Sequence, residues 1–336
     1  MDYVAYTITI STFVIGIIAN STAICAIAHY PEEKKNKHFG ILLLVQFIAG
    51  LLTSIFQSVF TMYLLLIESR LVYILYISDS FFYNNFSLKR FCISLVFFFL
   101  YFNVVYVAGL VFARYYLVCK QSYLNLKQGF LIFILTTTPC LCVSLFVWII
   151  VNEDIPENIL SDWIKKNNIS LIGISESTEA IAFNLGSMLS YIVYALLISI
   201  FLVTYIIIIL YVKKYRKYIA SYSSIMSNNT LIINRQFMII LIFQSLVPVI
   251  VTGIPIIIFF IMIIIENTKT LSTFGIFLVN LLMLVPCINP ILFLGLSSRN
   301  RKYLCFQFKK FTNCLLCKKE NTGLVNTFKS QSKMTT

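Results

Sequence analysis

The sequence predicts an all-α membrane protein, a bundle of seven transmembrane helices with its N-terminus outside the cell and its C-terminus in the cytoplasm. Three observations support this fold class. Hydrophobic residues make up 59% of the 336-residue chain and charged residues 12%, whereas soluble domains carry about 25% charged residues. The apolar residues form long runs rather than an alternating or helical-period pattern, which is typical of membrane spans. The charges between the runs are unequally distributed, and this asymmetry predicts the orientation.

Seven apolar segments each exceed the ~20 residues that a helix needs to cross ~30 Å of hydrocarbon. We expect a helix in each, because the bilayer offers no water to an unpaired backbone group. The predicted spans are 4–29, 41–67, 91–113, 130–151, 185–212, 237–265 and 271–296. The stretch 71–86 is too short to cross and contains Asp79, so we assign it to the first outer loop, lying at the membrane interface. The predicted organisation is a bundle over residues 1–300 and a basic cytoplasmic tail over 301–336.

Lysine and arginine predict the orientation, because cytoplasmic loops carry an excess of them. With the N-terminus outside, 20 of the 26 basic residues lie on the inner side, and ten of the 13 acidic residues lie on the outer side. The reversed topology would invert this bias. Two candidate glycosylation sites agree with it, since Asn85 and Asn168 each begin an Asn-x-Ser triplet in a predicted outer loop.

The composition of the spans excludes several function classes. No predicted span has Asp, Glu, Lys or Arg in its core, although ion and proton pathways are usually built from such residues. This argues against a proton-coupled transporter, a pump and a voltage sensor, but leaves a ligand-gated channel or a neutral-solute carrier open. HExxH, GxSxG and Walker motifs are absent from the sequence, so we predict no enzyme, no cofactor and no metal site. The net charge of +13 lies between the spans and in the tail, which favours anionic inner-leaflet lipid and a cytoplasmic protein over nucleic acid as partners.

Three cysteines, Cys305, Cys314 and Cys317, lie in the basic tail. The last two form a lone CxxC without a second pair, which disfavours zinc binding. Acylation of these thiols beside a polybasic stretch is the hypothesis that we favour.

Three short motifs lie in or at the ends of the spans. Arg114-Tyr115 closes the third span at its cytoplasmic edge. Pro248 and Pro255 lie seven residues apart in the sixth span, and therefore on one helical face. Asn289-Pro290 lies near the end of the seventh span and is followed by a basic cluster.

With these motifs the chain resembles the nematode seven-transmembrane chemoreceptors of the Str superfamily, which are G-protein-coupled receptors. The resemblance also includes Gln244, four residues before Pro248, and extends over roughly 4–305. It implies a receptor in the plasma membrane, at the cilium of a sensory neuron, that detects small environmental molecules and signals through a heterotrimeric G protein. A ligand-gated channel or neutral-solute carrier is the alternative.

Some residues depart from the rhodopsin-like pattern. Ala113 stands where an acidic residue would precede the arginine, so an acid–arginine pair within the third span is absent. Phe293 replaces the tyrosine of NPxxY. Cys92 has no cysteine partner in the second outer loop, 152–184, so we expect no disulfide between these elements.

The resemblance and the residues together suggest a mechanism. Proline removes a helical hydrogen bond and kinks the helix, so we expect Pro248 and Pro255 to form a hinge in the sixth span. Simple tolerance of proline in membrane helices is the alternative. We expect Arg114 to couple to the G protein, because a guanidinium can donate to the carbonyls of an inserted helix end. An ordinary positive-inside anchor is its alternative role.

The ligand is expected in the outer half of the bundle. Because the spans contain no charge, a neutral small molecule is favoured over an amine or a carboxylate. The candidate ligand-binding residues are Phe98, Tyr101, Phe102, Asn103, Thr252 and Asn280. Helix packing is the alternative role for each of them.

Overall fold

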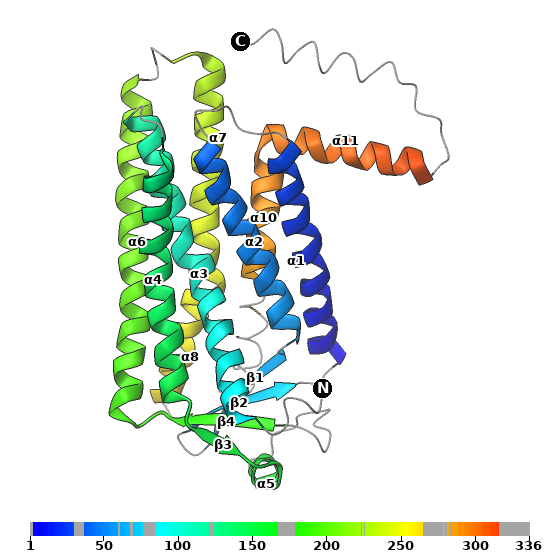
Figure 1. Ribbon diagram of the computed structural model, residues 1–336, viewed down its shortest axis with the longest axis vertical. Helices are drawn as coiled ribbons and strands as arrows, with labels where there is room; N and C mark the ends of the chain where they lie inside the picture. The colour runs from blue at the N-terminus through cyan, green and yellow to red at the C-terminus, as the bar shows by residue number, and fades with distance from the viewer. Residues whose placement is uncertain are drawn as a thin grey trace.

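The structure is a computed structural model in which long helices run side by side as an elongated bundle (Figure 1). It describes residues 3–29, 37–59, 61–67, 70–76, 85–120, 124–166, 179–222, 224, 226–264, 278, 281 and 284–315.

Among the described residues, six helices are long and apolar enough to cross a membrane. They are α1 (Tyr3–His29), α2 (Lys37–Val59), α3 (Phe86–Cys119), α4 (Leu126–Ile150), α6 (Met188–Tyr222) and α7 (Asn228–Pro248). The seventh predicted span is represented by α10 (Val285–Leu296), a shorter apolar helix. Most of the residues between 271 and 284 lie outside the described part of the chain.

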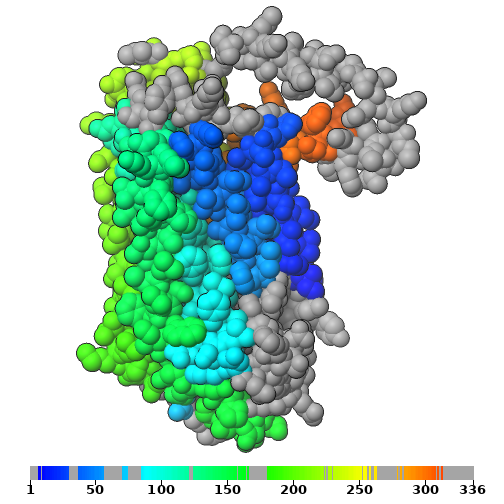
Figure 2. All heavy atoms as spheres, in the orientation of Figure 1, coloured from blue at the N-terminus to red at the C-terminus, as the bar shows by residue number. Residues whose placement is uncertain are grey.

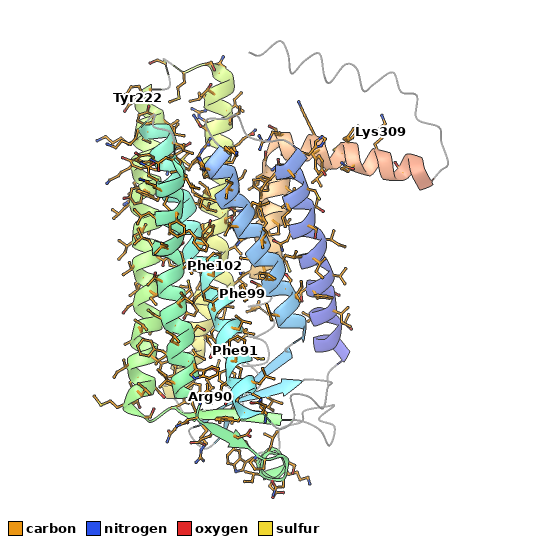
Figure 3. The ribbon with its side chains drawn as sticks, viewed as in Figure 1. Arg90, Phe91, Phe99, Phe102, Tyr222 and Lys309 are labelled. Atoms are coloured by element: carbon orange, nitrogen blue, oxygen red, sulfur yellow. The ribbon has the colours of Figure 1, made fainter. Side chains whose placement is uncertain are left out.

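The positions of the helix ends show which end of the bundle corresponds to the predicted cytoplasmic side. In Figure 3, Arg90 at the start of α3 lies at the lower end, while Tyr222 at the end of α6 lies at the upper end with Lys309. Helix α1 begins at the lower end and α10 finishes at the upper end (Figure 1), as an odd number of crossings requires. The upper end is therefore the predicted cytoplasmic side.

Helix α3 is the centre of the bundle. It is the most buried of the six long helices, with 72% of its most apolar window inside the protein. Small residues let its neighbours approach closely, which is a common device in membrane bundles. At Gly109, for instance, a Cβ atom would lie 2.8 Å from the Thr136 methyl group and 2.9 Å from an Ile132 methyl group, both on α4.

The sixth predicted span, 237–265, is not one regular helix. Helix α7 is followed by a π-helix, η2 (Val249–Gly253), and then by α8 (Ile254–Ile264). The Ile254 amide donates to the Val249 carbonyl, a spacing of five residues. Pro248 and Pro255 flank this segment and have no amide hydrogen to donate, which favours a local departure from the regular helix. The expectation that the two prolines share one face assumed 3.6 residues per turn, which η2 does not keep.

A four-stranded antiparallel sheet lies at the outer end of the bundle, in the order β1-β2-β4-β3. The strands are β1 (Thr61–Ile67), β2 (Arg70–Tyr76), β3 (Glu153–Ile155) and β4 (Glu179–Asn184). Strands β1 and β2 pair from Thr61↔Tyr76 to Ile67↔Arg70, and a short helix, α5 (Glu157–Lys166), follows β3.

The sheet corrects two boundaries of the sequence analysis. The second span was predicted to run through residue 67, but α2 ends at Val59 and 61–67 form a strand. The first outer loop, 71–86, was predicted to lie at the interface, and 71–76 instead belong to β2. The apolar run of β1 has the hydrophobicity of a span. As an edge strand it pairs along one side with β2, so its backbone hydrogen bonds run to another strand rather than within a helix.

The predicted tail begins with a helix, α11 (Ser298–Leu315), which projects sideways from the cytoplasmic end (Figures 1 and 2). Its first turn is tied to the bundle, because the Asn300 amide donates to the Phe293 carbonyl at 3.0 Å. Tyr303 is buried, with its ring 5.3 Å from the ring of His29. The boundary between bundle and tail at residue 300 stays a prediction. Helix α11 extends across that boundary.

Candidate functional site

The cytoplasmic end of the bundle holds one buried cation close to the sixth span. Arg114 on α3 is 6% exposed. Its Nη2 donates to the Asn234 Oδ1 of α7 at 3.0 Å. The Tyr215 hydroxyl of α6 donates to the backbone carbonyl of Asn234 at 3.4 Å, so three helices meet at this asparagine.

Two aromatic faces complete the enclosure of the guanidinium. The Arg114 Cζ lies 4.3 Å from the ring centroid of Phe237 and 5.6 Å from that of Phe39. A buried charge needs compensation, and among the described residues a neutral amide oxygen and two aromatic faces supply it. Ala113 is fully buried beside the arginine, in keeping with the missing acid noted in the sequence. The Arg114 Nε has no partner among the described residues, so a donor remains for a group that enters this end.

Tyr115 does not join this enclosure. Its ring lies 5.2 Å from the ring of Tyr211 on α6, and its side chain is partly exposed. Its packing is therefore against the fifth span rather than around Arg114.

A cluster of buried amides links the spans midway between the two ends. The Asn20 Nδ2 of α1 donates to the Pro286 carbonyl of α10 at 2.9 Å. The Gln244 Nε2 of α7 donates to the Asn289 carbonyl of α10 at 3.0 Å. Asn289 is 2% exposed, and neither of its side-chain polar atoms has a partner among the described residues. The motif residues of the sixth and seventh spans are thus in direct contact, five residues before the π-helix begins.

Aromatic side chains gather beneath the sheet at the outer end. The Tyr73 ring of β2 stacks with Phe183 of β4 at 5.9 Å and meets Phe97 of α3 at 6.2 Å. Phe183 in turn lies 6.3 Å from Tyr194 on α6. Burial raises the pKa of Tyr73 well above its usual value, so this phenol stays protonated. The sequence analysis missed Tyr73, Phe183 and Tyr194, because their proximity depends on the sheet.

One salt bridge joins two strands of the sheet, and a second joins the sheet to α3. Arg70 and Glu153 form an ion pair at 2.7 Å, and Lys89 and Asp154 form another at 3.1 Å. Arg90 donates to the Trp148 carbonyl at the end of α4.

The model of the serpentine type 7TM GPCR chemoreceptor Srd family matches residues 5–296. The chain belongs to this family. Srd is a nematode chemoreceptor family of the Str superfamily, so the resemblance drawn from the motifs is confirmed. A search of the curated proteins found no match.

Membership of the Srd family confirms several of the sequence predictions. The predicted all-α, seven-span fold class is confirmed, with the small outer sheet as an addition. So are the multi-pass location in the plasma membrane and the chemosensory class. The family is one of receptors rather than enzymes.

Among the predicted ligand residues of this Srd receptor, those on α3 divide between two sides of the helix. Phe102 stacks on Tyr106 and meets Phe133 of α4, and Phe98 stacks on Phe102. Tyr101 points the other way, with its ring 5.2 Å from Phe201 of α6. The structure therefore does not bring these side chains to one surface.

The remaining predicted ligand residues are tied to other helices or fall outside the described side chains. The Asn103 Nδ2 donates to the Thr53 hydroxyl of α2 at 2.7 Å, which uses the expected polar group in helix packing. The backbone of Thr252 lies in η2, but its side chain, like all of Asn280, is outside the described residues.

The predicted modification sites stay predictions. Asn85 is exposed and caps α3, its side chain accepting from the Leu88 amide at 3.1 Å. Cys305 is exposed on α11. Asn168, Cys317 and the side chain of Cys314 lie outside the described residues.

Proposed function

We propose that this Srd receptor binds a small, neutral molecule beneath the outer sheet and couples that event to a heterotrimeric G protein at the Arg114 end. The observation that carries the proposal is the contact of Arg114 with Asn234 and Phe237. It joins the third and sixth spans at the end where the basic residues gather.

The interactions of Arg114 with Asn234 and Phe237 are weak enough to break and re-form. A hydrogen bond from a charged donor contributes about 1.5–3 kcal/mol, and a cation over an aromatic face adds about 0.5–2 kcal/mol. Interactions of this strength hold the third and sixth spans together in the resting receptor, and a partner that binds Arg114 more strongly can replace them. Helix-end carbonyls of a G protein are suitable acceptors for the freed guanidinium.

The π-helix supplies a place where the sixth span can bend. Segments of this kind are frequent at functional sites and give a helix a local weakness. Bending at Pro248–Pro255 would let α7 and α8 move separately, once the bond from the Gln244 side chain to the Asn289 carbonyl of α10, one turn before Pro248, breaks. The inner end carries Asn234, so its outward movement would release Arg114.

The aromatic cluster under the sheet is the ligand wall that we favour. Tyr73 and Phe183 of the sheet meet aromatic side chains of α3 and α6, and sites of this kind suit apolar ligands with few polar groups. Tyr101, one of the predicted ligand residues, lies on the face of α3 that packs against α6. With no charged group among these side chains, the proposed ligand is neutral.

Basic residues near the cytoplasmic end suit the proposed partners. Arg301 and Lys302 on α11 are exposed, and cations here attract anionic inner-leaflet lipid by about 1 kcal/mol each. Location at a sensory cilium stays part of the proposal.

The test is a ligand screen on cells that express this chain, read through G-protein activation. The proposal expects responses that vanish when the G protein is inhibited and persist when conductances of the host cell are blocked. A ligand-evoked current or solute flux that survives G-protein inhibition would instead identify a channel or a carrier.

A further inference from the structure

A cavity among the described residues lies neither at the aromatic cluster nor at Arg114. It has a volume of about 790 Å³ and is enclosed by α3, α4 and α6, three helices that pack against one another and stand side by side in Figure 1. Sites for drug-sized ligands span about 300–1,000 Å³. Because none of the predicted ligand residues lines it, this is a second, separate site.

The cavity opens toward the hydrocarbon of the bilayer. Its rim is formed by side chains that are more than half exposed: Leu131 at 55%, Leu135 at 63% and Val203 at 54%. All three lie within predicted spans. Its floor is formed by buried residues of α3, including Ala108 and the side-chain-free Gly109. An occupant would therefore arrive from the membrane rather than from water.

The cavity lies in the cytoplasmic half of the bundle. Its residues on α3 run from Val105 to Tyr116, which is the part of the helix above Phe102 in Figure 3. One of them, Phe112, lies next to Ala113 and Arg114 in the sequence.

A neutral polar group marks the cytoplasmic end of the cavity. The Gln128 Nε2 donates to the Tyr116 hydroxyl at 2.9 Å, and the Asn125 amide donates to the Gln128 Oε1 at 3.1 Å. The N-terminal cap of α4 thus fixes the Gln128 side chain, and this side chain donates to the Tyr116 hydroxyl oxygen. Among the described residues no group accepts the hydroxyl proton of Tyr116, which leaves it for an acceptor in the cavity.

Three other hydroxyls in the lining already have acceptors. The hydroxyls of Thr136, Ser199 and Thr204 each donate to a carbonyl of their own helix. None of the described residues that line the cavity is charged. A phosphate or an ammonium group would find no counterion there, whereas an uncharged hydrocarbon body with one oxygen at its end matches the whole lining.

We infer that this cavity is a lipid-facing site for a neutral, sterol-sized lipophile, with its oxygen accepting from the Tyr116 hydroxyl and its apolar body lying against α3, α4 and α6. The site lies beside the Arg114 enclosure, and its existence does not depend on the proposed signalling function.

A photoreactive cholesterol analogue tests the inference on the purified full-length receptor in phosphatidylcholine nanodiscs. Cross-linked peptides are mapped by mass spectrometry, and unlabelled cholesterol is the competitor. We expect labelling of peptides within 126–139 and 199–211 that cholesterol competes away.

Matched tryptophan variants separate the cavity from the general lipid surface. Val203→Trp adds a bulky ring at the rim of the cavity, whereas Leu202→Trp changes the neighbouring residue, which is 59% exposed and does not line it. We expect at least about a tenfold loss of labelling for the first variant and less than about twofold for the second, given that an added side chain cannot share a filled site with the ligand. Tyr116→Phe should reduce labelling by about three- to tenfold, through the loss of one hydrogen bond.

Thermal unfolding of each variant establishes that it is folded. Equal labelling of the two tryptophan variants, in folded protein, would overturn the inference. So would labelling by a photoreactive phosphatidylcholine that cholesterol does not displace, because the cavity would then hold ordinary lipid chains.

Discussion

Replacing Asn234 with leucine removes the acceptor of the Arg114 guanidinium while keeping the side chain close to its original size. The lost hydrogen bond, 3.0 Å long and buried, comes from a charged donor and so contributes about 1.5–3 kcal/mol. If the open state lacks this bond, the ratio of open to closed receptor rises by about 10- to 150-fold, since each 1.4 kcal/mol is tenfold. An open population of about 1% would then exceed about 10%.

The assay is nucleotide exchange on a purified G protein without ligand, at equal amounts of receptor in nanodiscs. Asn234→Leu should raise the basal rate. Asn234→Asp should lower it, because a carboxylate at the same place strengthens the contact with Arg114. Ile233→Ala changes the adjacent residue, which is 51% exposed, and should leave the basal rate unchanged. An unchanged basal rate in both Asn234 variants, with intact folding, would refute the reasoning.

Three further predictions concern the hinge, the packing of α3 and the sheet. Pro248→Ala and Pro255→Ala should reduce agonist-evoked signalling more than surface expression, measured by labelling of intact cells; equal losses of both would point to a folding role. Gly109→Ala places a Cβ atom 2.8 Å from a methyl group of α4 and should cost about 1–3 kcal/mol of stability, seen as a lower Tm. Gly295→Ala, where a Cβ atom meets nothing within 4 Å, is its control and should leave the Tm unchanged; equal shifts would contradict the packing argument. Glu153→Gln breaks an ion pair whose side chains are about one-third exposed, so it should change the free energy of unfolding by less than about 1 kcal/mol, and a larger loss measured by denaturant unfolding would show that the pair matters more than its exposure indicates.

The spans were predictable because the bilayer imposes one requirement on every residue that crosses it. Runs of apolar residues and the placement of lysine and arginine express that requirement directly. The sheet was not predictable in the same way. Residues 61–67 have a hydrophobicity that suits either a helix or a strand, and their pairing with 70–76 depends on a contact that hydropathy does not encode.

For the contacts of the candidate site, the sequence indicated one residue of the pair but not its partner. Arg114 stood out because Arg114-Tyr115 closes the third span at its cytoplasmic edge, but its partner Asn234 is one polar residue among several at the start of α7. Which of them faces α3 follows from the packing of the helices. Asn103 shows a different case, since it was predicted as a ligand residue and its amide nitrogen bonds to Thr53, a packing contact that the sequence did not indicate. The cavity between α3, α4 and α6 is a matter of helix spacing, which no short motif records.

The central claim is that the Arg114 end of the bundle faces the cytoplasm and the sheet faces outward. Epitope tags at the N-terminus and after residue 336, stained in intact and in permeabilised cells, test it directly. We predict that the N-terminal tag is stained in intact cells and the C-terminal tag only after permeabilisation. Staining of both tags on the same side of the membrane would contradict the account.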